Sequence, residues 1–155
     1  MKVKEIMTGD VQCCSPQTNL AAAAKMMWDS DCGILPVLDV EGKVMGMITD
    51  RDICMAAATK NRPPSEFPVW ETITGNVYAC SLEDDIDDAL NTMANEQVRR
   101  LPVVDEDGVL RGMLSLNDIV LQANTDQSYE SLVRTLKAIS RHRTLAGSTP
   151  LAASG

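Results

Sequence analysis

Histidine is almost absent from this chain, which has one, His142, in 155 residues. Cysteine–histidine or serine–histidine catalysis therefore has a single candidate base. The five cysteines are odd in number and lack C-x-x-C spacing, so they indicate neither a disulfide framework nor a zinc site. We expect no enzyme activity and no metal requirement, and we interpret most of the thiols as small buried hydrophobic groups.

Basic and aromatic residues are also scarce. Fourteen Lys and Arg stand against 22 Asp and Glu, for a net charge of −8, and there are 2 Trp, 2 Tyr and 1 Phe. Because proteins bind phosphate backbones through basic side chains, we expect no nucleic-acid partner. No apolar run approaches the ~18–20 residues that span a membrane, and no apolar stretch after Lys2 and Lys4 forms a secretory signal. These absences predict a cytoplasmic protein without a membrane partner.

The chain does contain an internal repeat. A shift of 66 aligns residues 3–53 with residues 69–119 without a gap, and 18 of the 51 aligned positions are identical. Such self-similarity indicates a duplicated module. We therefore expect a first repeat at 1–60, a polar proline-containing linker at 61–68, a second repeat at 69–125, and a C-terminal helix and tail at 126–155.

Each copy has the same order of predicted elements. A short strand (11–14 or 77–80) precedes a helix with an apolar stripe at helical spacing. Two strands joined by a glycine turn follow (34–38 and 44–48, or 100–104 and 110–114), and then a second helix (50–58 or 116–124). On the first of these helices, Met26, Met27 and Trp28 are predicted to belong to the core.

The predicted fold class is α/β (α+β), with two tandem β-α-β-β-α repeats packed as a pseudo-twofold pair plus a C-terminal helix. That helix is expected at 128–143, and its apolar face is free to dock on the pair or on a partner. The face consists of Tyr129, Leu132, Val133, Leu136 and Ile139.

The sharpest motif is a glycine followed by two apolar residues, a hydroxyl residue and, three positions later, an aspartate. It occurs at 46–52, with Thr49 and Asp52, and at 112–118, with Ser115 and Asp118. One interpretation is a capping box at the start of a helix. The other is a ligand site in which the helix start binds phosphate, the carboxylate accepts bonds from a ribose diol, and the glycine leaves room for the ligand. Spacing alone leaves both open.

Several features together resemble a tandem cystathionine-β-synthase-type (CBS) domain pair. They are the duplication itself, the Leu-Pro-Val triplets at 35–37 and 101–103, the Asp…Gly turns at 39–42 and 105–108, the two hydroxyl–aspartate motifs, and Ile6-Met7-Thr8 at the front of the first copy. The resemblance covers about residues 3–123. It implies a regulatory, energy-sensing module that binds adenine nucleotides (AMP, ADP or ATP, with S-adenosylmethionine or NAD as further options) between its copies and forms homodimers.

The resemblance also implies roles for individual residues. Thr49 and Ser115 bond phosphate, and Asp52 and Asp118 hold ribose hydroxyls. The adenine pockets are walled by Thr8, Val11, Ile34, Pro36, Thr74, Val77, Tyr78 and Pro102.

Three arginines are candidate phosphate partners because a guanidinium group binds phosphate in a bidentate fork. They are Arg51, Arg99 and Arg100, and the alternative is that they are solvated surface residues. Arg99 and Arg100 stand opposite Gly33 and Ile34 in the repeat. The two clefts are therefore expected to differ in affinity for anions.

Two other functions remain open at this stage. One is a structural dimerisation module with empty clefts, and the other is a thiol redox protein that uses Cys13 or Cys14. Cys14 matches Cys80 in the repeat, which favours strand packing over reactivity. A small core in each copy of about 55 residues favours a homodimer. The regulated protein partner is not identified by the sequence.

Overall fold

The computed structural model describes residues 1–73 and 76–141. Thr74, His142 and the tail beyond it lie outside the described residues. The first copy holds α2 (Leu20–Asp29), β1 (Ile34–Leu38), β2 (Val44–Thr49) and α3 (Asp50–Thr59). The second holds β3 (Cys80–Ser81), α4 (Ile86–Glu96), β4 (Arg100–Val104), β5 (Leu110–Ser115) and α5 (Leu116–Gln122). The remaining elements are α1 (Val3–Ile6), the short turns η1 (Pro64–Glu66) and η2 (Val69–Glu71), and α6 (Asp126–Ile139).

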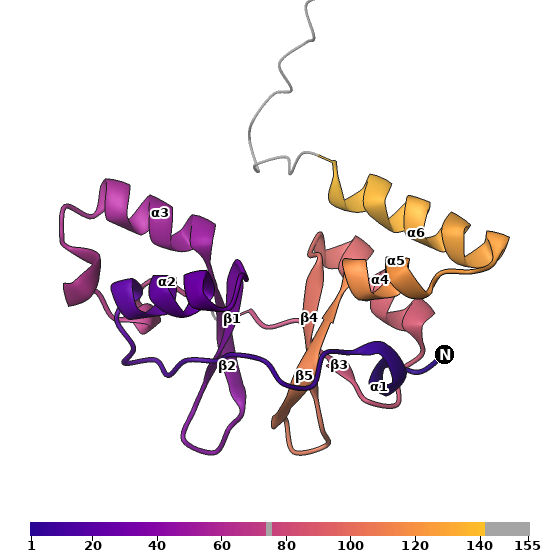
Figure 1. Cartoon of the computed structure of the whole chain (residues 1–155), viewed down its shortest axis with the longest axis horizontal. Coiled ribbons are helices and arrows are strands. Elements are labelled where there is room, and N and C mark those ends of the chain that lie inside the picture. Colours follow the sequence, from indigo (N-terminus) through magenta and orange to yellow (C-terminus); the bar gives the residue numbers. More distant parts are fainter. Residues whose placement is uncertain (74–75, 142–155) are drawn as a thin grey trace, which may run out of the picture.

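The predicted mixed α/β pair is confirmed, with one hairpin at the centre of each copy. β1 pairs antiparallel with β2, and β4 pairs antiparallel with β5 in the same register. In each turn an aspartate accepts two backbone N–H bonds, and a glycine adopts positive φ, +81° at Gly42 and +80° at Gly108. The two hairpins stand side by side, with the helices of each copy outside them (Figure 1).

A pseudo-twofold relationship is visible where the hairpin tips meet. Lys43 pairs with Val109, which is its own counterpart after the shift of 66. The Leu110 N–H also donates to the Gly42 carbonyl at 3.1 Å. The tips of the two hairpins therefore meet at equivalent residues.

The predicted four-residue first strands are wrong in length. The first copy has only a bridge between Cys14 and Val37, and β3 of the second copy has two residues, parallel to β4. The reason is that this segment crosses between the copies. Thr8 pairs with Met113 of the second copy, and Cys14, six residues later, pairs with the first. A segment that changes partner in so short a span cannot form a strand in one sheet.

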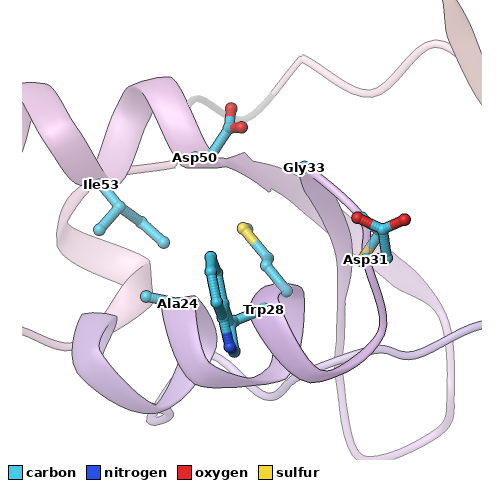
Figure 2. Close-up of a pocket in the computed structure, with 8 residues that line it drawn as sticks. Ala24, Trp28, Asp31, Gly33, Asp50 and Ile53 are labelled. Atoms are coloured by element: carbon cyan, nitrogen blue, oxygen red, sulfur yellow. The ribbon is translucent and has the colours of Figure 1, made fainter.

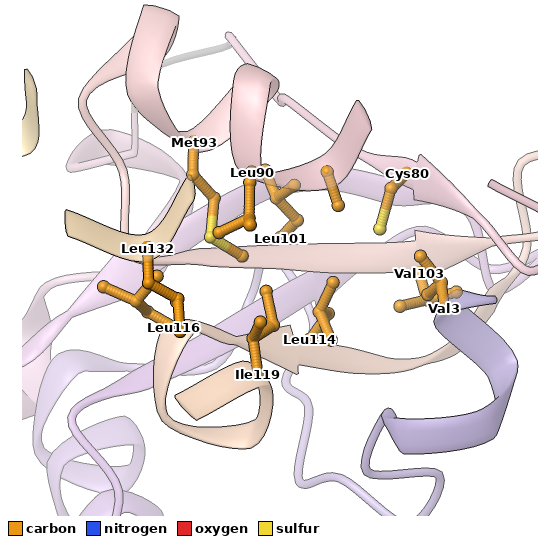
Figure 3. Close-up of a cluster of buried hydrophobic side chains, with 11 residues drawn as sticks. Val3, Cys80, Leu90, Met93, Leu101, Val103, Leu114, Leu116, Ile119 and Leu132 are labelled. Carbon is orange, nitrogen blue, oxygen red and sulfur yellow. The ribbon is translucent and has the colours of Figure 1, made fainter. Parts of the chain in front are cut away.

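The start of each repeat belongs to the core of the other copy. Val3 is completely buried in the second core, where it lies beside Val103 (Figure 3). Its counterpart Val69 is completely buried in the first core. Bridges follow the same exchange, with Lys2 paired to Asp85 and Pro68 paired to Asn19. Each hydrophobic core is therefore completed by a segment that crosses from the other repeat.

The helix stripes form the cores largely as predicted. α2 buries Leu20, Ala23 and Met27, and α4 buries Ala89, Leu90 and Met93, of which Ala89 and Met93 are the counterparts of Ala23 and Met27. Trp28 is the exception, since it is 86% exposed rather than part of the core. At 100° per residue it lies about 80° from Leu20 and about 100° from Met27, outside the buried face.

The C-terminal helix α6 packs on α4 of the second copy. Leu132 and Thr135 are buried, the Thr135 hydroxyl donates to the Leu90 carbonyl at 3.5 Å, and the Gln97 amide donates to Ala138 at 3.0 Å. Ile139 is partly buried against the same core, and three other members of the predicted apolar face remain exposed. They are Tyr129, Val133 and Leu136. None of the described helices is long and apolar enough to cross a membrane.

Candidate functional site

Both hydroxyl–aspartate motifs form complete capping boxes. The Thr49 N–H donates to Asp52 Oδ2 at 2.9 Å, and the Asp52 N–H donates to Thr49 Oγ1 at 3.1 Å. Ser115 and Asp118 repeat these bonds at 2.7 and 3.2 Å. Among the described residues, neither aspartate uses Oδ1 as an acceptor. Each half-buried carboxylate therefore caps its helix with one oxygen and keeps the other for a further donor.

One cleft between the copies, which we call the Thr49 cleft, has a volume of ≈ 420 Å³. Small-molecule sites have volumes of roughly 300–1,000 Å³. The motif of the first copy faces residues of the second across this cleft. Its lining is Ile34, Met47, Thr49, Asp52, Asn76, Tyr78, Val98, Arg99, Arg100 and Pro102.

The second cleft, the Ser115 cleft, has the inverse arrangement and a volume of ≈ 250 Å³. The motif of the second copy here faces residues of the first. Its lining is Thr8, Asp10, Val11, Gln12, Ser30, Cys32, Ile34, Pro36, Arg100, Met113, Ser115 and Asp118.

The clefts thus bring together most of the residues singled out from the sequence. Thr49, Asp52, Tyr78, Arg99 and Pro102 line the Thr49 cleft, and Thr8, Val11, Pro36, Ser115 and Asp118 line the Ser115 cleft, while Ile34 and Arg100 line both. Arg51 and Val77 line neither of these two clefts. Arg51 is exposed in the first turn of α3, and Val77 is half-buried. Thr74 lies outside the described residues.

Sequence reasoning missed Asp10 and Asn76, which occupy equivalent positions in the two clefts. It also missed the equivalent methionines Met47 and Met113. The repeat alignment could have indicated Asp10 and Asn76, because each lies two residues after a predicted wall residue, Thr8 or Thr74. Asp10 and Asn76 stand in no recognisable motif, so only the fold brings them to the clefts.

The motif glycines serve a purpose other than the one expected. A Cβ atom added at Gly46 would lie 2.9 Å from Ile73, and one added at Gly112 would lie 2.5 Å from the Thr8 carbonyl oxygen. The space beside each glycine is therefore occupied by the crossing segment. The expectation that these glycines leave room for a ligand is wrong.

The arginines at the clefts have no anionic partner within the protein as described. Arg99 and Arg100 are exposed, and neither guanidinium forms an ion pair or hydrogen bond among residues 1–73 and 76–141. Arg62 and Arg111, by contrast, pair with Glu71 and Asp105. Two unpaired cations beside a cleft in a chain of net charge −8 favour an anionic ligand.

The buried thiols are poor nucleophiles. Burial, reinforced by the neighbouring Cys13, raises the pKa of Cys14 to about 11. Burial, with a contribution from Asp84, raises the pKa of Cys80 to about 12. Since the thiolate is the reactive form, these shifts oppose redox chemistry at Cys14. Within the described part of the chain, no three His, Cys, Asp or Glu side chains gather as a metal site would require.

A separate groove of ≈ 400 Å³ lies on the outer side of the first copy, between α2 and α3. Figure 2 shows Ala24 and Trp28 on α2 and Asp50 and Ile53 on α3 around it. None of the predicted nucleotide-binding residues lines this groove. In the second copy, α6 covers the equivalent side of α4.

Comparison with known proteins agrees with the duplicated architecture. The profile of the CBS domain matches residues 3–59 and again residues 69–123. The chain belongs to the CBS domain family. The Bacillus subtilis protein YlbB is 32% identical over 127 residues, which cover 81% of this chain and 84% of that protein.

Two solved structures show the same CBS pair fold. Hypoxic Response Protein I, crystallised with two coordinated zinc ions, has 31% identity and a TM-score of 0.73 over 80% of this chain and 100% of that one. The CBS domain pair of protein MJ0100, in complex with 5′-methylthioadenosine and S-adenosyl-L-methionine, has 25% identity and a TM-score of 0.69 over 79% of this chain and 94% of that one.

Proposed function

We propose that this CBS pair is a non-catalytic regulatory module that binds adenine nucleotides (AMP, ADP or ATP) in the Thr49 and Ser115 clefts. The observation that carries the proposal is the repeated grouping of a hydroxyl, a carboxylate with a free oxygen and an unpaired arginine in each cleft. A hydroxyl and a guanidinium suit phosphate, and a carboxylate suits a ribose diol. The adenosine ligands in the MJ0100 complex support the same class of ligand.

Each cleft is built from both copies, so a ligand in either cleft contacts both. Binding therefore favours the arrangement of the copies that gives the better contacts, and a partner protein that reads this arrangement senses the ligand. The proposal places the module in the cytoplasm, where such nucleotides are available, and requires no metal.

A thermal-shift panel tests the proposal. At a concentration of 100 times Kd, a ligand that binds only the folded state adds about 2.7 kcal/mol to the free energy of unfolding. We expect AMP, ADP or ATP to raise the melting temperature, and GMP at the same concentration to have a smaller effect. No shift with any adenine nucleotide would leave the clefts without this function.

We further propose that the module is a homodimer that associates through the outer face of α2 and α3. Trp28 lines the α2–α3 groove and is 86% exposed. Monomeric proteins rarely expose large contiguous apolar patches. A second copy is the occupant to which the CBS pair architecture points, and a purely structural dimerisation module is the competing function if both clefts remain empty.

A further inference from the structure

The two clefts carry opposite charge, although one duplicated module formed both. In the Thr49 cleft, Arg99 and Arg100 face one carboxylate, Asp52, so the ionised lining has a net charge of +1. In the Ser115 cleft, Asp10 and Asp118 face one arginine, Arg100, so the net charge is −1. The overall negative charge of the chain does not explain the difference.

The reversal arises at two positions of the repeat. Asp10 of the Ser115 cleft corresponds to Asn76 of the Thr49 cleft, and Arg99 of the Thr49 cleft corresponds to Gly33. Some apolar pairs, such as Pro36 with Pro102 and Met47 with Met113, are unchanged, whereas Gln12 and Cys32 correspond to Tyr78 and Val98. The charge difference between the clefts therefore comes from the two positions named above.

A side chain at Gly33 would require the exposed Asp50 side chain to move. A Cβ atom at this position would lie 2.9 Å from Asp50 Oδ2. The counterpart of Asp50 is Leu116, so the carboxylate beside Gly33 has no equivalent at the matching position near Arg99. The Asp50 and Leu116 N–H groups donate to the Gly33 and Arg99 carbonyls at 3.0 and 2.9 Å, so the backbone is equivalent and only the side chains differ.

We propose that the two clefts select adenosine ligands by charge. The Thr49 cleft takes the ligand with the larger number of phosphates, because two unpaired guanidinium groups neutralise it. The Ser115 cleft keeps one guanidinium group but favours adenosine ligands with fewer phosphates or with a neutral or cationic 5′ end, because Asp10 repels phosphate and attracts a cation. Asp10 and Arg99 are the specificity-determining residues. This inference rests on the proposed adenine-nucleotide function.

The experiment measures each cleft separately by calorimetry. An Asp118→Ala background reports the Thr49 cleft, and an Asp52→Ala background reports the Ser115 cleft. The probes are ADP, adenosine and S-adenosylmethionine. We expect the ratio of ADP affinity to adenosine affinity to be at least about tenfold higher in the Thr49 cleft, as the loss of one charge-assisted hydrogen bond implies. S-adenosylmethionine is expected to prefer the Ser115 cleft.

Exchange of the counterpart residues provides the sharper test. Arg99→Gly should lower ADP affinity in the Thr49 cleft by about ten- to a hundredfold and leave adenosine affinity within about twofold. Asp10→Asn should raise ADP affinity in the Ser115 cleft by about three- to tenfold. Glu106→Gln, in an exposed hairpin turn, removes the same charge away from both clefts and is the matched control. Arg99→Met provides a second variant if the glycine destabilises the fold.

The outcomes separate this inference from the function on which it rests. Equal ADP-to-adenosine ratios in the two clefts, or no change with Asp10→Asn and Arg99→Gly, would overturn charge selection while nucleotide binding stands. A failure of all three probes to bind the wild-type protein would overturn both.

Discussion

Ile34 and Arg100 occupy the same position of the duplicated module, and each lines both clefts. No other described residue does so for these two clefts. Each begins the first strand of its hairpin and pairs with the hydroxyl residue of its own copy, Ile34 with Thr49 and Arg100 with Ser115. Both residues lie between the two clefts, and of the two only Arg100 is charged.

Replacement of Arg100 is therefore expected to affect both clefts. Arg100→Met removes a phosphate donor from each, so ADP affinity should fall by about ten- to a hundredfold at both. Arg99→Met, the matched control, should weaken binding only in the Thr49 cleft. Titration of both variants in the single-cleft backgrounds measures the difference. An effect of Arg100→Met confined to one cleft would contradict a shared role.

The aspartates test whether capping is the whole function of the motif. Asp52→Ala and Asp118→Ala should each cost up to about 1 kcal/mol of stability through loss of the capping bond. If Oδ1 also holds a ribose diol, each variant should in addition lose about ten- to a hundredfold in affinity at its own cleft. Ser128→Ala is the control, because it removes part of a capping box in α6, outside the two clefts. Equal behaviour of all three would leave only capping.

The crossing segments predict an unusual pattern of destabilisation. Val3→Ala should cost about 1–3 kcal/mol, because the side chain is completely buried. Native-state hydrogen exchange should show the loss of protection in α4 and β4 of the second copy, to which Val3 belongs. Val69→Ala should show it in α2 and β1. Loss of protection confined to the copy nearest in sequence would contradict the assignment of Val3 and Val69 to the opposite cores.

The α2–α3 face predicts how the dimer is weakened. Trp28→Ser should raise the dimer dissociation constant by about thirtyfold or more, since an exposed tryptophan at the centre of an interface is typically worth 2 kcal/mol or more. Val40→Ser, at a fully exposed position in the first hairpin turn, should have no effect. Analytical ultracentrifugation distinguishes the two. A wild-type protein that sediments as a monomer at all practical concentrations would remove the interface.

The buried cysteines predict a loss of stability in alkali. Because the pKa of Cys14 is about 11 and that of Cys80 about 12 in the folded protein, against 9.0 ordinarily, the folded state retains protons that the unfolded state releases. Stability from these groups is complete below pH 9 and falls as the pH rises toward 11–12. Denaturant titrations across this range measure it. At pH 8, iodoacetamide should modify the exposed Cys54 and spare Cys14 and Cys80 until the chain unfolds.

Elements whose pattern is local were predictable from the sequence. β1 and β4 have the predicted bounds, because the apolar runs end at Asp39 and Asp105, whose side chains close the turns. α2 and α4 also follow from their apolar spacing. Trp28 was misplaced because apolar character does not show whether another surface covers a residue.

The core that each crossing segment joins was not predictable in this way. The shift of 66 shows that Val3 and Val69 are equivalent but is silent on which core each one joins. The clefts are affected in the same manner. Asp52 and Asp118 stand in motifs, whereas Asp10 and Asn76 reach the clefts only because the chain crosses between the copies beside them. Arg51, which lines neither cleft, shows that proximity to a motif in sequence is a weaker guide.

The exchange of Val3 and Val69 between the cores has a consequence for how such a protein could arise. A chain with a single copy would carry an N-terminal segment that belongs to the core of another molecule. It would complete its fold only by exchanging this segment with a second, identical chain. Fusion of two such chains replaces bimolecular association by intramolecular association at an effective concentration of roughly millimolar. The fused halves need no longer be identical. Divergence at Asp10 and Asn76, or at Gly33 and Arg99, becomes possible only after that step.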